Sequence, residues 1–504
     1  LIGLADLAGR ERDFSQAADL LRLAADIQPG DARCWQLLGN ALESGRQPAA
    51  AREAYDRAVC LAPEQPIGWR GRGVAEWQLG RFAAARDDFR RAAALELNRP
   101  ETDRAMDGYN VACAELLLGN FSDGWEWSEW RWRTKLHAPQ KRATSAPRWT
   151  GREPIEGKTV FVHSEQGLGD TLQFCRYVPL LAARGARVVL EAQPPLLPLL
   201  RTLPGVAELR PELTPPPDCD YHCPLLSLPG CFGTRLDTIP SAVPYLTVEP
   251  ARVEAWARRL GTKRRPRIGL AWSGNTDHPN DARRTLPLAA LAPLLALDAE
   301  FVSLQPAVRP ADEATLAACP RLRHFGAELG DFADTAALGL NLDRIVSVDT
   351  SVAHLAGAFA RPTHLLLPLA GRGPPLLRRP MAQLGHMGET GVQAGHGLQG
   401  QHLIGEDDPY PRLHGVGVLG RMAQLVEAAL DGAQLAAYPQ GHHFHAGVPV
   451  GIEFDNPHRF GVVLLGERVG QGGAGVGHPG TIELLGAVQV PQGDVVEAAE
   501  GLHA

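Results

Sequence analysis

The stretch SVDTSVAHLAG, residues 347–357, contains residue types that can hold an anion. An apolar run ends at Asp349, and Thr350 and Ser351 then open a segment of small residues that also contains His354. If this segment is a helix, the backbone N–H groups of its first turn lack helical partners, and the helix dipole favours negative charge there. Hydroxyl groups add donors, so the stretch predicts a phosphate-binding turn. The alternative is that one of these side chains only caps the helix and His354 packs against a neighbour.

A second stretch, SEQGLGDTLQ at 164–173, has two glycines where a predicted strand turns into a predicted helix. Gly167 and Gly169 leave room for a ligand to approach the backbone, and Asp170 follows at the start of the helix. Asp170 is therefore either an N-cap or a carboxylate that faces a ligand as a general base. A dinucleotide-binding fingerprint is a weak match, because Leu172 takes the place of its third glycine.

A third stretch, WSGNTDHPNDARRTLPLAAL at 272–291, is a polar loop between a predicted strand and a predicted helix. It contains Asn275, Arg283 and Arg284 and lies at the carboxyl edge of a predicted sheet, where open α/β sheets bind ligands. An arginine donates hydrogen bonds in a fork that matches phosphate oxygens, so Arg284 is a candidate to balance diphosphate charge without a metal. A solvated charged loop explains the same residues equally well.

Other groups of ligand-type residues are weaker. The stretch CDYHC offers Cys219, His222 and Cys223, but a second ligand pair at zinc-site spacing is missing from the sequence. The histidines within 442–445 indicate at most adventitious metal binding. The sequence also lacks a nucleophile elbow, a Walker loop and a His-Glu-x-x-His motif. We therefore expect no metal site and no cofactor.

The elements before residue 135 repeat along the chain. A shift of 34 residues superimposes alanine, tryptophan and proline positions: Ala17, Ala51 and Ala85; Trp35 and Trp69; Pro29 and Pro63. This pattern resembles the tetratricopeptide repeat, in which antiparallel helix pairs stack and bury a shared apolar face. We predict a helical array over 1–135. Four tryptophans near its end are a candidate binding platform, although packing against the next domain is the favoured interpretation: Trp125, Trp127, Trp130 and Trp132.

The middle of the chain alternates predicted strands and helices, which is typical of parallel sheets covered by helices. A first α/β half is expected over 155–250, with strand 158–165, helix 170–185 and strand 186–193. A second half is expected over 262–370, with strands 267–272, 300–304, 344–349 and 363–369 and helices 286–297, 335–342 and 352–360. Two such Rossmann-like halves predict a ligand cleft between them.

Composition limits the remaining choices. The net charge of -7 and the pI near 6.2 argue against a broad nucleic-acid surface, and no 18-residue uncharged apolar run predicts a membrane span. The eight cysteines lack the tight spacing of a secreted disulfide framework, which favours a reducing cytoplasm. Leu1 falls within an apparent helix, so the chain is interpreted as a possible fragment. Residues 371–504 are rich in Gly and His without firm periodicity, and we expect an irregular tail.

Three stretches together resemble bacterial tetratricopeptide-repeat glycosyltransferases, whose α/β part is similar to the heptosyltransferase, family 9, type of GT-B enzyme. They are VHSEQGLGDTLQFCRYVPLL, GLAWSGNTDHPNDARRTLPL and DFADTAALGLNLDRIVSVDTSVAHLAGAFARP. The resemblance covers about Leu1 to Pro368. It implies transfer of a sugar from a nucleotide-sugar donor to a protein or glycan acceptor that the helical array presents.

The resemblance also implies roles for individual residues. Asp170 would deprotonate the acceptor hydroxyl, and attack would invert the anomeric centre. Arg284 would help the leaving group depart, in place of the metal that other transferases use. The remaining candidate donor-binding residues are Gly167, Gly169, Asn275, Asp349, Thr350, Ser351 and His354.

The sequence departs from this family pattern after Leu369. Relatives of this type continue with an aromatic, acidic segment and a closing helix, whereas this chain continues with GRGPPLLRRPMAQLGHMGET. The difference indicates a reading-frame shift or an unrelated extension. Two alternative functions therefore remain open: a non-catalytic repeat scaffold with a degenerate transferase domain, and a nucleotide-dependent oxidoreductase that binds NAD at Gly167 and Gly169.

Overall fold

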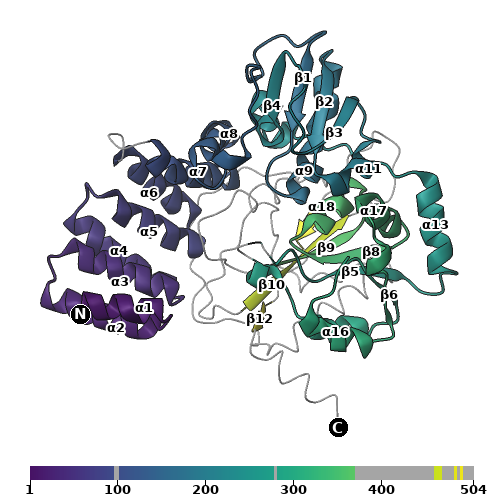
Figure 1. Cartoon of the computed structure of the whole chain (residues 1–504). Coiled ribbons are helices and arrows are strands. Elements are labelled where there is room, and N and C mark those ends of the chain that lie inside the picture. Colours follow the sequence, from purple (N-terminus) through teal and green to yellow (C-terminus); the bar gives the residue numbers. More distant parts are fainter. Residues whose placement is uncertain are drawn as a thin grey trace, which may run out of the picture.

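The computed structural model consists of a curved helical array followed by two α/β halves (Figure 1). It describes residues 1–95, 101–276, 278, 281–368, 459–467, 482–484 and 489–491. In Figure 1 the array forms one side of the molecule, and the first half lies above the second.

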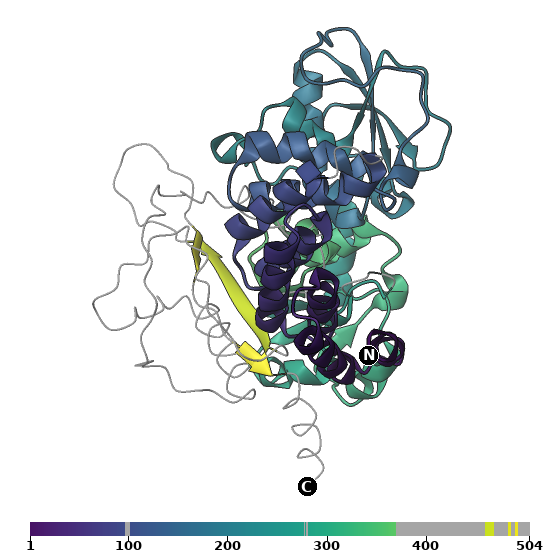
Figure 2. The ribbon, with the colours of Figure 1, turned by 90° about the vertical axis from the view of Figure 1, so that its left-hand side faces the viewer.

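Helices α1 to α8 form the array, and each packs against the next along the chain. Their bounds are α1 Ile2–Arg10, α2 Phe14–Ile27, α3 Ala32–Ser44, α4 Pro48–Leu61, α5 Pro66–Gln78, α6 Phe82–Leu95, α7 Glu101–Leu117 and α8 Phe121–Ser128. Short turns join the helices from α1 to α6 and join α7 to α8, so the helices that they join run in opposite directions. Figure 2 shows the array from its outer side, with its helices stacked from the N-terminus toward the upper half. This arrangement confirms the predicted repeat architecture.

Small residues allow the helices of the array to approach closely. The Tyr55 ring fills the space beside Gly39, where an added Cβ atom would lie 2.6 Å from Tyr55 Cε1. The buried Tyr55 hydroxyl donates a hydrogen bond to Asn40 Oδ1 at 2.7 Å, so its polar end is satisfied. The repeated glycine, alanine and aromatic positions of the sequence therefore follow from close helix packing.

The array ends against the first α/β half. The Trp125 ring is buried, and its Nε1 donates to Thr234 O at 2.8 Å. Trp127 and Trp130 are half-buried, with ring centroids 5.0 Å apart. The packing interpretation is confirmed for Trp125. The segment that follows α8, residues 129–148, is called the connector below and contains the 3-10 turns η1 Glu129–Arg133 and η2 Ala138–Gln140.

The first half contains a parallel sheet with strand order β3-β2-β1-β4. Its strands are β1 Thr159–His163, β2 Arg187–Ala192, β3 Val206–Pro211 and β4 Tyr221–Pro224. Its helical elements are α9 Leu168–Phe174, η3 Cys175–Tyr177, α10 Val178–Ala183, η4 Pro194–Leu196, α11 Leu197–Leu200, η5 Leu225–Ser227, α12 Leu228–Cys231 and η6 Leu236–Thr238. The single helix predicted over 170–185 is divided at the start of α10, because Pro179 has no N–H to donate to a preceding carbonyl.

The second half contains five parallel strands in the order β9-β8-β5-β6-β7. They are β5 Arg267–Ala271, β6 Glu300–Ser303, β7 Leu322–His324, β8 Arg344–Val348 and β9 Thr363–Pro368. The helical elements are α13 Pro250–Leu260, α14 Asp281–Arg284, η7 Leu288–Leu291, α15 Ala292–Leu295, α16 Pro310–Ala317, η8 Gly326–Glu328, α17 Phe332–Leu340 and α18 Ser351–Ala358. In place of the single helix predicted over 286–297, the structure has the 3-10 turn η7 followed by the one-turn helix α15. Pro293 lies at the start of α15.

Three strands of the predicted tail extend the second sheet. Strand β10, Arg459–Glu467, pairs antiparallel with β9, and β11 Ile482–Leu484 and β12 Gln489–Pro491 pair antiparallel with β10. The sequence RFGVVLLGE of β10 is apolar and rich in strand-forming residues, which favours this pairing. The rest of the tail, including the histidines within 442–445, lies outside the described residues.

Each half has one point where the strand order reverses. In the first half β2 and β4 flank β1, and in the second half β6 and β8 flank β5. Ligands of open α/β sheets bind beyond the carboxyl ends of the strands at such points. Helices α9 and α18 follow β1 and β8, lie between the two sheets in Figure 1, and pack against each other. The two reversal points are therefore where a functional site is expected.

Candidate functional site

Helix α18 begins at the carboxyl end of β8, as the opening motif predicts. Thr350 is its N-cap in an extended conformation, with φ -140° and ψ 173°, and the Thr350 side chain forms no capping hydrogen bond with the helix. The Thr350 hydroxyl instead lies 3.3 Å from Ser347 Oγ. Ser351 and Asp349 are half-buried beside it. The first turn of α18 thus faces the reversal point between β5 and β8 without a side-chain cap from Thr350.

Arg284 joins the loops that follow β5 and β8. Its Nη1 donates to Asp349 O at 3.0 Å, which connects α14 to the turn before α18. Gly274 lies against the same guanidinium, because an added Cβ atom there would lie 2.7 Å from Arg284 Nη2. A cation is therefore held at the residue before Thr350, while its contact with a phosphate stays a prediction.

Arg309 is a second cation at this position that the sequence motifs did not indicate. Its Nη2 donates to Asp281 Oδ2 at 2.5 Å, to Thr285 Oγ1 at 3.0 Å and to Gly274 O at 3.1 Å. Arg309 directly precedes α16, so its role depends on the loop after β6 reaching across to the loop after β5. The available signal was a basic residue in the loop after the strand predicted over 300–304, and such a residue is too common to identify a site.

The other residues predicted in this loop are less well placed or lie outside the described side chains. Asn275 is exposed, and its carbonyl accepts a hydrogen bond from His278 N at 3.1 Å. The side chain of Arg283 lies outside the described residues. Asn275 therefore belongs to the same loop as Arg284, while its contact with a donor stays a prediction.

In the first half, Gly167 is the N-cap of α9, and Asp170 is the third residue of that helix. Asp170 Oδ2 accepts a hydrogen bond from Gly167 N at 2.9 Å, and the Asp170 residue is 6% exposed. Gly167, and not Asp170, is therefore the N-cap residue, and Asp170 stabilises the helix start from the third helical position. The general-base interpretation is not tested by this contact and stays a prediction.

The two predicted motifs meet at Gly169 and His354. A Cβ atom at Gly169 would lie 2.7 Å from His354 Cδ2, and His354 is 9% exposed. This contact joins α9 to α18 through predicted site residues of both halves. The glycine is needed here for close packing, and the packing interpretation of His354 is also observed. The structure therefore brings the Asp170 and Thr350 motifs to one position between the halves.

Cys223 and His222, two of the three residues proposed as weak metal ligands, have other partners. Cys223 Sγ lies 3.9 Å from Cys231 Sγ, and His222 Nδ1 lies 3.3 Å from His163 Nε2. Burial lowers the pKa of His163 to about 3, and the neighbouring His222 and Arg142 contribute to this shift. Among the residues that the structure describes, no group of three or more His, Cys, Asp or Glu side chains is arranged to hold a metal ion.

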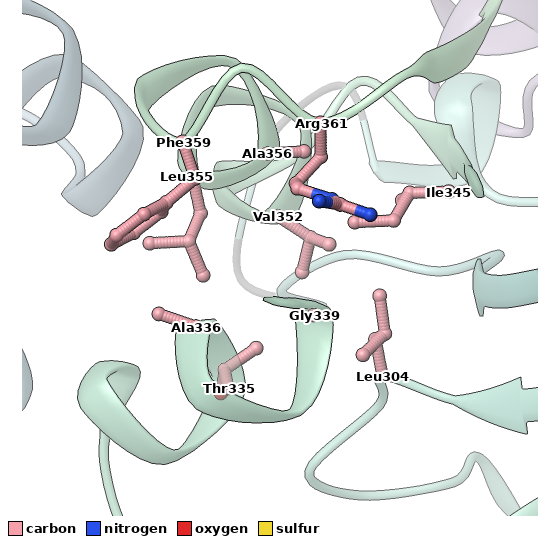
Figure 3. Close-up of a pocket in the computed structure, with 10 residues that line it drawn as sticks. All are labelled: Leu304, Thr335, Ala336, Gly339, Ile345, Val352, Leu355, Ala356, Phe359 and Arg361. Atoms are coloured by element: carbon pink, nitrogen blue, oxygen red, sulfur yellow. The ribbon is translucent and has the colours of Figure 1, made fainter. Parts of the chain in front are cut away.

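A small pocket in the second half is separate from these residues. Figure 3 shows it between α17 and α18, and it is lined by Leu304, Thr335, Ala336, Gly339, Ile345, Val352, Leu355, Ala356, Phe359 and Arg361. The guanidinium of Arg361 donates to Leu342 O, and the rest of the lining is mostly apolar. None of the predicted site residues lines this pocket, and its apolar character does not suit a diphosphate.

Comparison with known proteins identifies the N-terminal helices. The tetratricopeptide repeat family model matches residues 2–66 and 37–98. Protein FlbA of Caulobacter vibrioides is 27% identical over 380 residues, which are 70% of this chain and 63% of that protein. The chain thus spans less than two thirds of the length of this relative.

Solved glycosyltransferases are among the similar structures. Escherichia coli ADP-heptose LPS heptosyltransferase II is 17% identical, with a TM-score of 0.32 over 41% of this chain and 84% of that chain. The glycosyl transferase family 9 protein of Veillonella parvula is 11% identical, with a TM-score of 0.34 over 44% of this chain and 84% of that chain. A mutant O-GlcNAc transferase of Thermobaculum terrenum is 14% identical, with a TM-score of 0.26 over 86% of this chain and 93% of that chain.

Among the described residues, no helix is both long enough and apolar enough to cross a bilayer. The TM-scores of these three glycosyltransferase structures are all below 0.5. Residues 2–98 of this chain match the tetratricopeptide repeat model, and the chain continues into two Rossmann-like parallel sheets.

Proposed function

We propose that the chain transfers a sugar from a nucleotide-sugar donor to a hydroxyl of a protein or glycan acceptor. The observation that carries this proposal is the meeting of the Asp170 and Thr350 motifs across the two halves, at Gly169 and His354. A carboxylate and a cation-lined helix start at one position are the two chemical elements that such a transfer needs.

The second half is the proposed donor side. The diphosphate of the donor would lie at the first turn of α18, where backbone N–H groups and the helix dipole favour negative charge. Arg284, held on Asp349 O at 3.0 Å, would offset the charge that develops on the departing nucleoside diphosphate. These groups would make a metal ion unnecessary. Asn275, Ser351 and His354 are the further proposed donor contacts.

The first half is the proposed acceptor side. The acceptor oxygen would form a bond to the anomeric carbon while the bond from that carbon to the diphosphate oxygen breaks. The acceptor proton would pass to the Asp170 carboxylate. A single displacement of this kind inverts the anomeric centre. Gly167 and Gly169 would let the substrates approach the backbone. The helical array would bind the acceptor and hold it near Asp170, and the reaction would take place in the cytoplasm.

A non-catalytic scaffold is the second candidate, and one observation favours it. Asp170 is buried and accepts a hydrogen bond from Gly167 N, and His354 packs against Gly169. Residues of both motifs therefore stabilise the fold. In that case the repeats would bind a partner protein and the α/β halves would only hold the array. Such a scaffold has no reason to bind a nucleoside diphosphate.

Calorimetric titration separates the two functions. UDP, GDP and ADP should be titrated separately into the full chain, with the matching nucleosides as controls that lack the diphosphate. We expect one nucleoside diphosphate to bind, and Arg284→Met to weaken that binding about tenfold through loss of a charge-assisted hydrogen bond. Absence of binding by all three diphosphates would contradict the transferase and favour the scaffold. A search for turnover with sugar conjugates of the bound nucleotide completes the test.

A further inference from the structure

The connector inserts a buried arginine into the first α/β half. Arg131 is fully buried, and its Nε and Nη2 donate to the two oxygens of Glu165, each at 2.8 Å. Nη2 also donates to Ser227 Oγ at 2.7 Å, and Nη1 donates to Ser128 O and Glu129 Oε1. The planar guanidinium is therefore bonded along its whole edge.

This arginine lies at the reversal point of the first sheet. Glu165 follows β1, and Ser227 follows β4, which is the strand next to β1 on one side of that point. Glu165 Oε1 also accepts a hydrogen bond from Leu226 N at 3.2 Å, so the two loops are joined directly as well. A residue from the end of the helical array thus occupies the position where an α/β sheet usually receives a ligand.

A second connector residue holds the next residue of the same loop. Gln140 Oε1 accepts a hydrogen bond from Gln166 N at 2.9 Å. Gln166 has a φ of 61°, which lies in the left-handed region that non-glycine residues rarely adopt. Such a conformation persists only where neighbouring contacts hold it. The connector therefore stabilises an unfavourable backbone conformation directly before Gly167.

These contacts continue to the predicted catalytic aspartate. Gly167 N donates to Asp170 Oδ2 at 2.9 Å, and Gly169 packs against His354 of the second half. Glu165, Gln166 and Gly167 are consecutive, so the position of Asp170 depends on both connector contacts. A shift of the loop by even about 1 Å would move a general base out of reach of its proton.

We propose that Arg131 and Gln140 are positioning residues through which the repeat array sets the geometry of the Asp170 loop. This inference rests on the proposed transferase function for its effect on turnover. Its structural part, that the connector holds residues 165–167, is independent of that function. The connector contacts the helices α7 and α8 of the array as well as the Asp170 loop. An acceptor that binds to the array is therefore coupled to the Asp170 loop through the connector.

The test uses Gln140 in the full chain, because Arg131 is buried and its loss affects folding. Gln140→Leu removes the acceptor oxygen, whereas Gln140→Glu keeps one and serves as the matched rescue. We expect the amide of Gln166 to exchange with solvent about tenfold faster in Gln140→Leu and at the original rate in Gln140→Glu. Turnover at saturating donor should fall about tenfold in Gln140→Leu, while the nucleotide dissociation constant stays within about twofold.

The outcomes separate this inference from the proposed function. Unchanged exchange at residues 164–170 in Gln140→Leu would overturn the inference whether or not the chain transfers sugar. Faster exchange with unchanged turnover would also overturn it, because the loop position would then not control the reaction. Faster exchange in a chain whose wild type turns over no donor would support the holding of the loop and reject the transferase. A loss of nucleotide affinity equal to the loss of turnover would indicate a general structural defect instead and reject a positioning role.

Discussion

His364 is a buried histidine whose ring nitrogens have no hydrogen-bond partner among the residues that the structure describes. It lies in β9 at 3% exposure. Burial lowers the pKa of His364 to about 4, and the charge of Arg344 contributes to this shift. An unsatisfied buried ring costs stability, so this histidine is a weak point of the second sheet.

We predict that His364 makes the fold sensitive to acid. Its pKa in the folded chain is about 4, whereas an unfolded histidine titrates near 6.5. The unfolded state therefore takes up a proton first, and stability present above pH 6.5 is lost as the pH falls toward 4. The loss from this one group is about 2 kcal/mol at pH 5. The difference between the melting temperatures at pH 7 and pH 5 should be smaller in His364→Leu than in the wild type.

His364→Gln is the control for this experiment, because it keeps a polar side chain but does not titrate. It should lose the pH sensitivity without gaining stability at pH 7, whereas His364→Leu should gain stability there. A His364→Leu chain that retains the full difference between pH 7 and pH 5 would show that other groups cause the acid sensitivity.

Asp170 combines two interpretations that a single substitution separates. The amide oxygen of asparagine accepts a hydrogen bond as a carboxylate oxygen does, so Asp170→Asn should preserve the bond to Gly167 N and the melting temperature. It cannot accept the acceptor proton, and we expect turnover to fall by about 10² to 10⁴ with unchanged nucleotide affinity. Asp13→Asn, at a cap of α2 far along the array, is the matched control. Intact turnover in Asp170→Asn would mean that another group is the base.

At the scale of elements, the packing of α9 on α18 joins the two halves. Each helix begins at the carboxyl end of its strand, and their small residues allow a close crossing. Apolar residues of α17 and α18 also share one core with the first half, among them Ala333 and Leu355, together with Phe359 at the end of α18. The relative position of the two predicted motifs is therefore set by helix packing and not by a long loop.

We predict that Gly169→Ala weakens this crossing. The added methyl would lie 2.7 Å from His354 Cδ2, so the ring or the helix must move. Overpacking of this kind costs about 1–3 kcal/mol. Gly9→Ala in α1 is the control, because nothing lies within 4 Å of the added methyl and alanine favours a helix. Thermal unfolding should show a lower melting temperature for Gly169→Ala and an equal or higher one for Gly9→Ala.

At the scale of the whole molecule, the array and the first half are joined by a buried ion pair. The side chains of Arg131 and Glu165 are both fully buried, and each of the two bonds between them is 2.8 Å long. Burial of both charges is costly, and their bidentate contact offsets that cost. Removal of one partner leaves the other charge unpaired inside the protein, and this destabilises the fold more than removal of both charges.

We predict a difference between the single and double substitutions at this pair. Arg131→Met should cost about 3–5 kcal/mol because Glu165 is left buried without its cation. The double substitution Arg131→Met with Glu165→Met should recover a large part of this loss, since apolar side chains replace both charges. Thermal unfolding of the wild type, both single variants and the double variant gives the coupling energy. Equal and additive losses would contradict an ion pair that joins the two parts.

Much of the architecture could be predicted from sequence periodicity. The shift of 34 residues reflects helix pairs that must stack closely, which the Tyr55 and Gly39 contact illustrates. Buried strands such as 267–272 are apolar on both faces because helices cover both sides of a parallel sheet. Helix ends were less predictable, since Pro179 and Pro293 divide or shorten helices that apolar periodicity alone would extend.

The sequence by itself determined the local chemistry of this protein, because a strand that leads into Asp349 and Thr350 or into Gly167 and Asp170 sets its own turn and helix start. Only the tertiary structure decided which of these turns meet. Gly169 reaches His354 from the other half of the fold, and Arg131 reaches Glu165 from the end of the array. Such contacts depend on how helices pack across two sheets, and a spacing in the sequence carries no information about that distance in space.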